Sequence, residues 1–245
     1  MKMWKSIVIS LLALFCVLML SVPTAKAATE GDYTYTVTDD TATITAVSSS
    51  VSGDITIPST LGGYPVTAIG NNAFFGRSNV TSVIIPTGVT SIGNTAFSQC
   101  TGLTGVTIPD TVTAIGNNAF YNCKLLTAIT IPDSVTSIGG WAFYTCKSLT
   151  SIIIPDSVTS IGDYAFRECT SLTSVIIPDG VTHIDDGAFM GCTGLTSVTI
   201  PGKVERFGRE VFKGCPNLTV YGTGGFFSKV RKAARKSRVK YKKIK

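Results

Sequence analysis

The strongest constraint on the fold of this 245-residue chain is a sequence unit that recurs every 23 residues. Prolines mark the unit at Pro86, Pro109, Pro132, Pro155, Pro178 and Pro201, and phenylalanines mark it at Phe74, Phe97, Phe120, Phe143, Phe166, Phe189 and Phe212. Self-similarity at a fixed period of about 20 to 50 residues is typical of a solenoid. Each coil of a solenoid contacts its neighbours, so the repeat predicts a core that grows along one axis.

Each repeat contains one strand signal followed by two turns. Residues 105–108 alternate outward and inward positions, and Pro109 ends the strand because it has no N–H for a ladder. A second apolar stretch leads to Gly116, where a positive φ is cheap. Asp185 takes this place in another coil and also tolerates the left-handed conformation. Residues 119–123 predict a short helical or 3-10 turn on the far side.

Stacked strands about 4.8 Å apart predict one broad parallel sheet of seven or eight strands. Charged residues make up 15% of the chain, below the usual quarter, so this face should be lined by hydroxyl groups. An outward column of side chains along it is our candidate partner-binding site: Ile84, Thr107, Thr130, Ile153, Ile176 and Thr199. The alternative is that its isoleucines serve strand propensity.

The residues of the repeat also carry a resemblance to a known family. Leu-x-x-Val-x-Ile at 103–108 and Ile-Pro-Asp-Ser-Val-Thr-Ser-Ile-Gly at 131–139 resemble the BspA-type leucine-rich repeat, over about residues 33–222. Ordinary leucine-rich repeats have an asparagine two residues after the strand, whereas hydroxyl residues such as Ser134 take that place here. The resemblance implies a secreted or surface protein that binds host or matrix proteins, with no enzyme activity and no cofactor.

The fold class expected is an α/β-type repeat solenoid, a leucine-rich repeat with a parallel β-sheet on one face and helical or 3-10 turns on the other. Residues 1–27 predict a signal peptide, because basic residues precede an apolar run and Ala25-Lys26-Ala27 offers a cleavage site. Residues 28–54 predict a β-hairpin cap, and residues 55–222 an array of about seven coils. A basic segment, 223–245, should form a helix and a strand that cap the open end. We expect no transmembrane span after cleavage.

The charge of the chain is divided between these parts. Residues 28–228 hold eight Lys and Arg against all 15 acidic residues, a net charge of −7. The C-terminal basic cluster is Lys229, Arg231, Lys232, Arg235, Lys236, Arg238, Lys240, Lys242, Lys243 and Lys245. Such a cluster is a candidate site for a polyanion. No nucleic-acid motif accompanies it, so an anionic cell-surface polymer is the expected partner rather than a specific nucleic acid.

Six cysteines share one place in the repeat: Cys100, Cys123, Cys146, Cys169, Cys192 and Cys215. An even number in a secreted chain is compatible with disulfides. Parallel side chains in one column do not converge as a disulfide requires, and a thiol packs well as a small apolar group. Buried free thiols are the favoured interpretation, and disulfides or a metal ladder remain alternatives.

Other candidate residues point to structure rather than to chemistry. The single histidine, His183, fills a variable, solvent-facing position, and catalysis would need a nucleophile and an orienting acid beside it. The aspartates that follow the prolines are typical turn residues, and weak calcium binding along that column is the alternative. Tyr121, Trp141, Tyr144 and Tyr164 should lie on the convex side. We therefore expect no catalytic, cofactor-binding or metal site.

The predicted function is a secreted or cell-surface adhesion module that binds a protein or glycan, and the alternative is a structural spacer held to an anionic surface.

Overall fold

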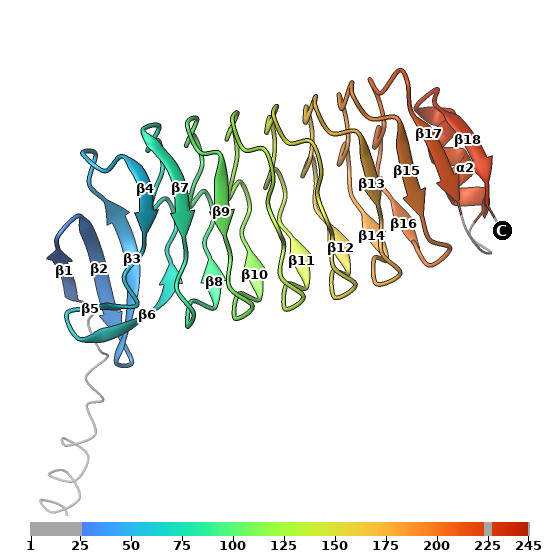
Figure 1. Cartoon of the computed structure of the whole chain (residues 1–245). Helices are drawn as coiled ribbons and strands as arrows, with labels where there is room; N and C mark the ends of the chain where they lie inside the picture. Colours follow the sequence, from blue (N-terminus) through green and yellow to red (C-terminus); the bar gives the residue numbers. More distant parts are fainter. Residues whose placement is uncertain (1–25, 223–226, 245) are drawn as a thin grey trace, which may run out of the picture.

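A computed structural model describes residues 26–222 and 227–244. The chain forms a row of stacked coils that curves gently from a β-rich N-terminal end to an end carrying helix α2 (Figure 1). The predicted leader therefore lies outside the described residues except for Lys26 and Ala27, and so do the linker 223–226 and Lys245.

The longest sheet is built from the second apolar stretch of each repeat, which the sequence analysis did not assign as a strand. Its short strands pair in parallel along the solenoid (Figure 1). The strands are β6 (Tyr64–Ile69), β8 (Ser91–Ile92), β10 (Ala114–Ile115), β11 (Ser137–Ile138), β12 (Ser160–Ile161), β14 (His183–Ile184) and β16 (Arg206–Phe207). The continuous sheet therefore lies on the second apolar stretch of the repeat, not on the first as predicted.

The first stretch, predicted to form one broad sheet, is divided in two. One part holds β4 (Gly53–Thr56), β7 (Val80–Ile84) and β9 (Gly105–Thr107). The other holds β13 (Ser174–Ile176), β15 (Ser197–Ile200), β17 (Thr219–Gly222) and β18 (Lys240–Lys243). Between them, Thr130 and Ile153 form an isolated parallel bridge. The coils remain bonded there, because the N–H of Thr150 donates to the carbonyl of Thr127 at 3.2 Å.

The far side of each coil consists of turns, and residues 26–222 as described contain no helix. The reason is visible in the backbone bonding. The N–H of Tyr121 closes a turn on the carbonyl of Asn118 at 3.0 Å, whereas the N–H of Phe120 donates to Ala142 in the next coil at 2.8 Å. A helix needs consecutive bonds within its own segment, and alternate N–H groups here bond to the neighbouring coil instead. The far side therefore keeps single turns closed by i→i+3 bonds, as a 3-10 turn has, but these turns do not join into a helix.

The glycine of the repeat has a different role from the one predicted. Neither Gly116 nor Asp185 has a positive φ; the left-handed residues follow two positions later, as at Asn118 with φ 57°. A Cβ on Gly116 would lie 2.6 Å from the backbone nitrogen of Asn94 in the preceding coil. Gly116 therefore permits close approach of two backbones.

The core is one continuous stack of identical positions. The seven phenylalanines of the repeat are fully buried, and successive rings stack with centroids 4.7 to 6.0 Å apart. Stacked rings bury large apolar areas and attract one another directly. Because each ring is covered by the rings before and after it, no coil completes its core alone.

Additional strands and one helix occupy the two ends. At the N-terminal end, β1 (Lys26–Glu30), β2 (Tyr33–Thr38) and β3 (Thr41–Val47) are antiparallel, and β3 pairs in parallel with β6. Strand β5 (Thr60–Leu61) forms a tight hairpin with β6, where the first repeat is longer. At the other end, α2 (Phe227–Lys236) buries Val230 and Ala234, and β18 pairs with β17. No helix within the described ranges has the length and apolarity needed to cross a bilayer.

Candidate binding surfaces

The outward column contains exposed aliphatic side chains. Ile153 and Ile176 are 72% and 71% exposed, and Ile84 is 49% exposed. Register pairs the column's members two by two: Ile84 with Thr107, Thr130 with Ile153, and Ile176 with Thr199. The threonines at 107 and 130 are exposed, whereas Thr199 is half-buried. The structure thus places all six predicted residues on one face, in the order Ile, Thr, Thr, Ile, Ile, Thr.

Two shallow hollows follow this column. One, of about 360 Å³, is lined in part by Ile84, Thr107 and Thr130. The other, of about 400 Å³, is lined in part by Ile153, Ile176 and Asp156. The hollows are formed where side chains of adjacent coils leave gaps in the surface, so a ligand could contact apolar, hydroxyl and carboxylate groups together.

Many threonine hydroxyls bordering this face already take part in bonding between coils. Those of Thr104, Thr127, Thr150, Thr173 and Thr196 each donate to the carbonyl of the threonine 23 residues earlier, at 2.8 to 3.4 Å. At the first coil, the Ser82 and Thr81 hydroxyls both donate to the Asp54 carboxylate at 2.7 Å. These bonds lower the pKa of Asp54 because they favour its charged form. The hydroxyl-rich composition therefore serves the stacking of coils as well as the surface.

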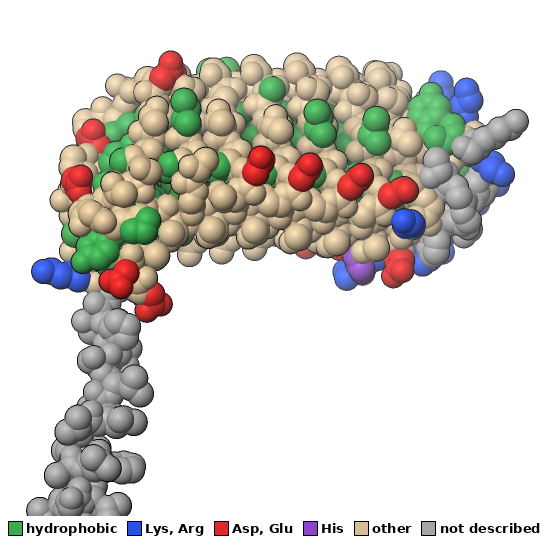
Figure 2. Space-filling model, turned by 60° about the horizontal axis from the view of Figure 1, so that its bottom comes forward, with side chains coloured by type: hydrophobic (Ala, Val, Ile, Leu, Met, Phe, Trp, Pro, Cys, Tyr) green, Lys and Arg blue, Asp and Glu red, His purple; other side chains and the backbone are tan. Residues whose placement is uncertain are grey.

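Acidic side chains form a row along the solenoid, and basic side chains gather toward the end that carries α2 (Figure 2). Asp110, Asp133, Asp156 and Asp179 occupy one exposed place in successive coils. Within the part of the chain that the structure describes, no group of three or more His, Cys, Asp or Glu is arranged to hold a metal ion.

The C-terminal basic cluster lies on α2, on β18 and between them. Its nine described members are all exposed, and Lys245 lies outside the described residues. The cluster does not stand alone, because three exposed basic residues of the last coil face the same end: Arg206, Arg209 and Lys213. Sequence reasoning missed this part. The high density of charged residues over 203–213 was the available signal.

The six repeat cysteines are buried and free. Each thiol donates a hydrogen bond to the carbonyl of the phenylalanine 26 residues earlier, at 3.0 to 3.3 Å. Burial raises the pKa of Cys100 to about 12 and that of Cys215 to about 11, and it raises the pKa of the four between them well above the usual value. A buried, neutral thiol is a poor nucleophile and a poor metal ligand. Buried free thiols, the favoured interpretation of this column, agree with this geometry.

The convex aromatic residues pack against one another. Tyr121 stacks on Tyr144 at 5.0 Å, and Trp141 stacks on Tyr164 at 5.4 Å. The Arg167 guanidinium lies 5.4 Å from the ring centroid of Tyr144 and 5.5 Å from that of Tyr164. Trp141 is exposed, whereas the three tyrosines are half-buried. Burial, together with the nearby Glu168 carboxylate, raises the pKa of Tyr144. The ring faces are largely occupied by these contacts.

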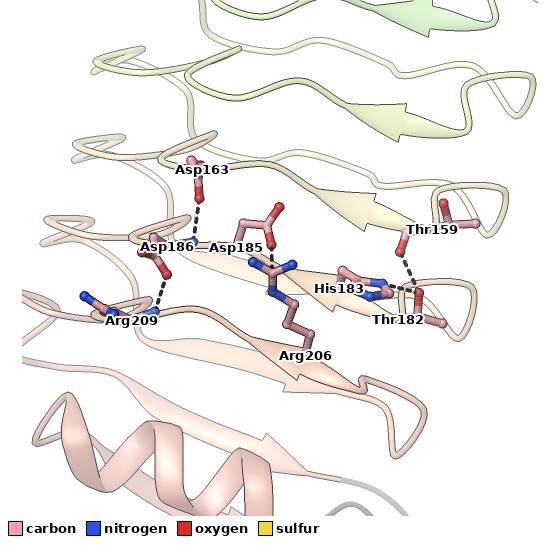
Figure 3. Close-up of polar contacts among 8 residues, drawn as sticks. All are labelled: Thr159, Asp163, Thr182, His183, Asp185, Asp186, Arg206 and Arg209. Atoms are coloured by element: carbon pink, nitrogen blue, oxygen red, sulfur yellow. Dashed lines mark hydrogen bonds and ion pairs between the residues drawn. The ribbon is translucent and has the colours of Figure 1, made fainter.

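The surroundings of His183 contain no catalytic arrangement. Figure 3 shows His183 beside Thr182, with the His183 Nδ1 2.7 Å from the hydroxyl oxygen of Thr182. His183 is half-buried in β14 rather than fully solvent-facing. Asp185 bonds instead toward Arg206, whose Nε lies 3.6 Å from its carboxylate oxygen. The Asp185 carboxylate, which could have oriented the imidazole of His183, is therefore directed toward Arg206 instead.

The geometry described here defines a class: a parallel β-solenoid whose 23-residue coils share one core. A profile of the BspA type leucine rich repeat region, in six copies, matches residues 67–152 and 93–219. The chain belongs to the BspA-type leucine-rich repeat family, as the resemblance predicted. Members of this family are typically surface or secreted proteins and are known as non-enzymatic binding scaffolds.

Solved structures of bacterial relatives are similar to this chain. A leucine rich repeat protein from T. pallidum is 32% identical with a TM-score of 0.73, over 89% of this chain and 98% of that chain. A leucine-rich repeat protein from Bacteroides capillosus is 34% identical over 51% of this chain and 96% of that chain, with a TM-score of 0.47. A leucine rich cell surface protein from Faecalibacterium prausnitzii is 29% identical over 83% and 78%, with a TM-score of 0.48. Among curated proteins none matches this chain.

Proposed function

We propose that this protein is a secreted or cell-surface adhesion module, without enzyme activity, that binds an extracellular protein or glycan through the outward column. The observation that carries the proposal is the pair Ile153 and Ile176, which are more than two-thirds exposed on adjacent coils and line one hollow. The predicted signal peptide supports placement outside the cell.

Strand propensity accounts poorly for Ile153, whereas Ile176 lies in the regular strand β13. Ile153 takes part in an isolated bridge rather than in an extended ladder, so a β-branched residue gains little there from regular strand packing. A partner that buried one such side chain would gain about 1.5–3 kcal/mol. Hydroxyl and carboxylate groups around the isoleucines would form the polar rim that surrounds the apolar centre of an interface.

A second candidate function is a structural spacer held to an anionic surface by its C-terminal basic cluster. The observation that favours it is the exposure of all nine described cluster members at one end of the solenoid. Attachment through this end would leave the outward column available along the side, so the two functions are compatible.

The test is capture of partners from host or extracellular-matrix extracts by the immobilised protein. The variant Ile153→Asp with Ile176→Asp should lose a specific partner that the wild type captures, because each substitution places a charge where apolar burial is required. The matched control is Phe75→Asp with Leu125→Asp, two side chains exposed by 48% and 51% in other positions of the repeat. Equal capture by the wild type and the column variant would contradict this site.

A further inference from the structure

The last coil and helix α2 enclose a cleft lined mainly by basic side chains, which we call the cap cleft. Its larger depression, of about 520 Å³, is lined by Arg209, Lys213, Lys236 and Arg238, with Glu210 as the acidic member. Its smaller depression, of about 300 Å³, is lined by Arg206, Lys229, Lys232 and Lys236, with Glu205 as the acidic member. Lys236 borders both depressions, so one polymer chain could pass from one to the other.

The charge of the cap cleft is strongly positive. Seven basic residues face two acidic ones, and the Glu210 carboxylate is already paired with the Lys213 ammonium at 2.8 Å. Like charges that converge in a concave surface raise the local potential more than the same charges spread over a convex one. The cleft also joins residues from two separate segments, 206–213 and 229–238, so it exists only in the folded chain.

The position of the cleft at the C-terminal end of α2 works slightly against an anion. That end of a helix carries about half a negative charge on its unpaired carbonyls. Here three of the last carbonyls are occupied, because the N–H groups of Ser237, Arg238 and Val239 donate to the carbonyls of Ala233, Arg235 and Ala234 at 3.0 to 3.1 Å. Four basic side chains in the larger depression therefore outweigh the helix end.

The surroundings of the cleft favour a polymer over a membrane. Val230 and Ala234, on the apolar side of α2, are fully buried against the solenoid, so the described side chains of α2, those of residues 229–236, leave no apolar face free to enter a bilayer. Half-buried Phe207 is the one aromatic side chain among the lining residues, so the cleft lacks a series of aromatic platforms on which unpaired bases stack. Guanidinium groups such as those of Arg209 and Arg238 suit bidentate bonding to sulfate or phosphate oxygens.

We propose that the cap cleft binds a linear anionic polymer by its sulfate or phosphate groups, with groups held in both depressions on either side of Lys236. The proposal rests on the attachment of the basic end to an anionic surface, and it deepens that function. It assigns binding to a shaped cleft that includes Arg206, Arg209 and Lys213 of the last coil, rather than to the net charge of the C-terminal segment.

The experiment compares two triple variants of the mature full chain, each of which removes two arginine charges and one lysine charge. The cleft variant is Arg209→Gln, Lys236→Gln and Arg238→Gln; the control is Arg231→Gln, Arg235→Gln and Lys240→Gln, whose residues are exposed outside both depressions. The probes are a labelled heparin oligosaccharide for sulfate and poly(glycerol phosphate) for phosphate. The cleft variant should bind at least about tenfold more weakly at about 0.15 M salt. The slope of its log affinity against log salt concentration should fall by the equivalent of about two ionic contacts. The affinity of the control variant should change by about threefold or less.

Each outcome bears on the proposal. Loss for the cleft variant alone supports it, and the better of the two probes identifies sulfate or phosphate as the source. Equal loss for both variants overturns the cleft and leaves the attachment of the basic end intact. Failure of the wild type to bind either polymer overturns the attachment as well. Tighter binding to vesicles of anionic lipid than to either polymer overturns the choice of ligand. Matching thermal unfolding of the three proteins excludes misfolding, and the single variant Lys236→Glu provides a second measurement at the shared position.

Discussion

The Sγ of Cys146 donates a hydrogen bond to the carbonyl oxygen of Phe120, 26 residues earlier in the preceding coil, at 3.3 Å. The same relationship recurs at the other five repeat cysteines. Each thiol thus fills the core and gives a second hydrogen bond to a carbonyl that already accepts a backbone N–H, as Phe120 does from Cys123 at 3.2 Å. The six repeat cysteines, whose regular spacing suggested redox or metal chemistry, instead form hydrogen bonds that hold adjacent coils together.

We predict that stability falls at high pH because of these thiols. Burial raises their pKa in the folded chain, so unfolded thiols, with a pKa of about 8.5, ionise first. The contribution of the thiols to stability should be constant below about pH 8 and decrease as pH rises toward about 11 to 12, by up to about 1.4 kcal/mol per thiol and pH unit. Urea unfolding at pH 7, 9 and 10 measures this decrease. Cys146→Ala removes one titrating group and should reduce the slope; disulfide-linked cysteines would give no such slope.

We predict opposite effects of alanine at two glycines. A Cβ at Gly116 would meet the backbone of Asn94 at 2.6 Å, so Gly116→Ala must separate two coils and should cost about 1–3 kcal/mol. A Cβ at Gly105 would have no atom within 4 Å. Gly105→Ala should therefore be neutral or raise stability by about 0.4–1 kcal/mol through the unfolded state. Chemical denaturation measures both; similar costs would contradict the role of close approach.

We predict that Thr95→Asn stabilises the chain. Thr95 has a φ of 60°, a left-handed conformation that is unfavourable for a β-branched residue. Asn72 and Asn118 occupy the same place in the adjacent coils with φ values of 60° and 57°, and asparagine tolerates this region. The gain should be about 1 kcal/mol in the free energy of unfolding. Thr107→Asn in β9 is the control, and it should be neutral or destabilising because asparagine is a poor strand residue.

The repeat period, the inward strand positions and the buried Phe and Cys columns could be predicted because one inference about Val106 or Phe120 applies to every coil. The local conformation could not be predicted equally well. In a solenoid the N–H of Phe120 is free to bond within its turn or to the next coil, and the sequence of one coil does not record which partner it takes. The stacked Val-Thr-x-Ile segments, two residues long as strands, carry too little periodicity to signal the longest sheet.

The asparagine ladder shows the same limitation. Hydroxyl residues stand where ordinary leucine-rich repeats have asparagine, and the Ser134 hydroxyl donates to the carbonyl of Val112 at 2.5 Å. A ladder of side-chain oxygens nevertheless exists one turn later, where Asn94 accepts from the N–H of Asn117 at 2.8 Å. Of the candidate sites, the outward column followed from alternation alone. The cap cleft did not, because it unites residues that only the closure of α2 over the last coil brings together.

The ladder is interrupted at Gly140, which has no side chain, and resumes at Asp163 and Asp186 (Figure 3). The two adjacent aspartates Asp185 and Asp186 give a last prediction. Asp186 accepts a hydrogen bond from the N–H of Arg209 at 2.6 Å, so Asp186→Ala should cost about 0.5–1.5 kcal/mol. Asp185 stands where other coils have glycine, and its buried Oδ1 has no hydrogen-bond partner among the described residues.

Asp185 forms an ion pair with Arg206 at 3.6 Å, and the Arg206 side chain is largely exposed. The pair therefore contributes at most about 1 kcal/mol to stability. Removing a buried, unsatisfied oxygen should recover about 1–3 kcal/mol, against about 0.5–1 kcal/mol for the added flexibility of glycine. At the middle of these ranges, Asp185→Gly raises stability by about 1 kcal/mol, whereas Asp186→Ala lowers it. Urea denaturation at neutral pH separates the two; a loss for Asp185→Gly as large as that for Asp186→Ala would show that the Asp185 carboxylate stabilises the stack.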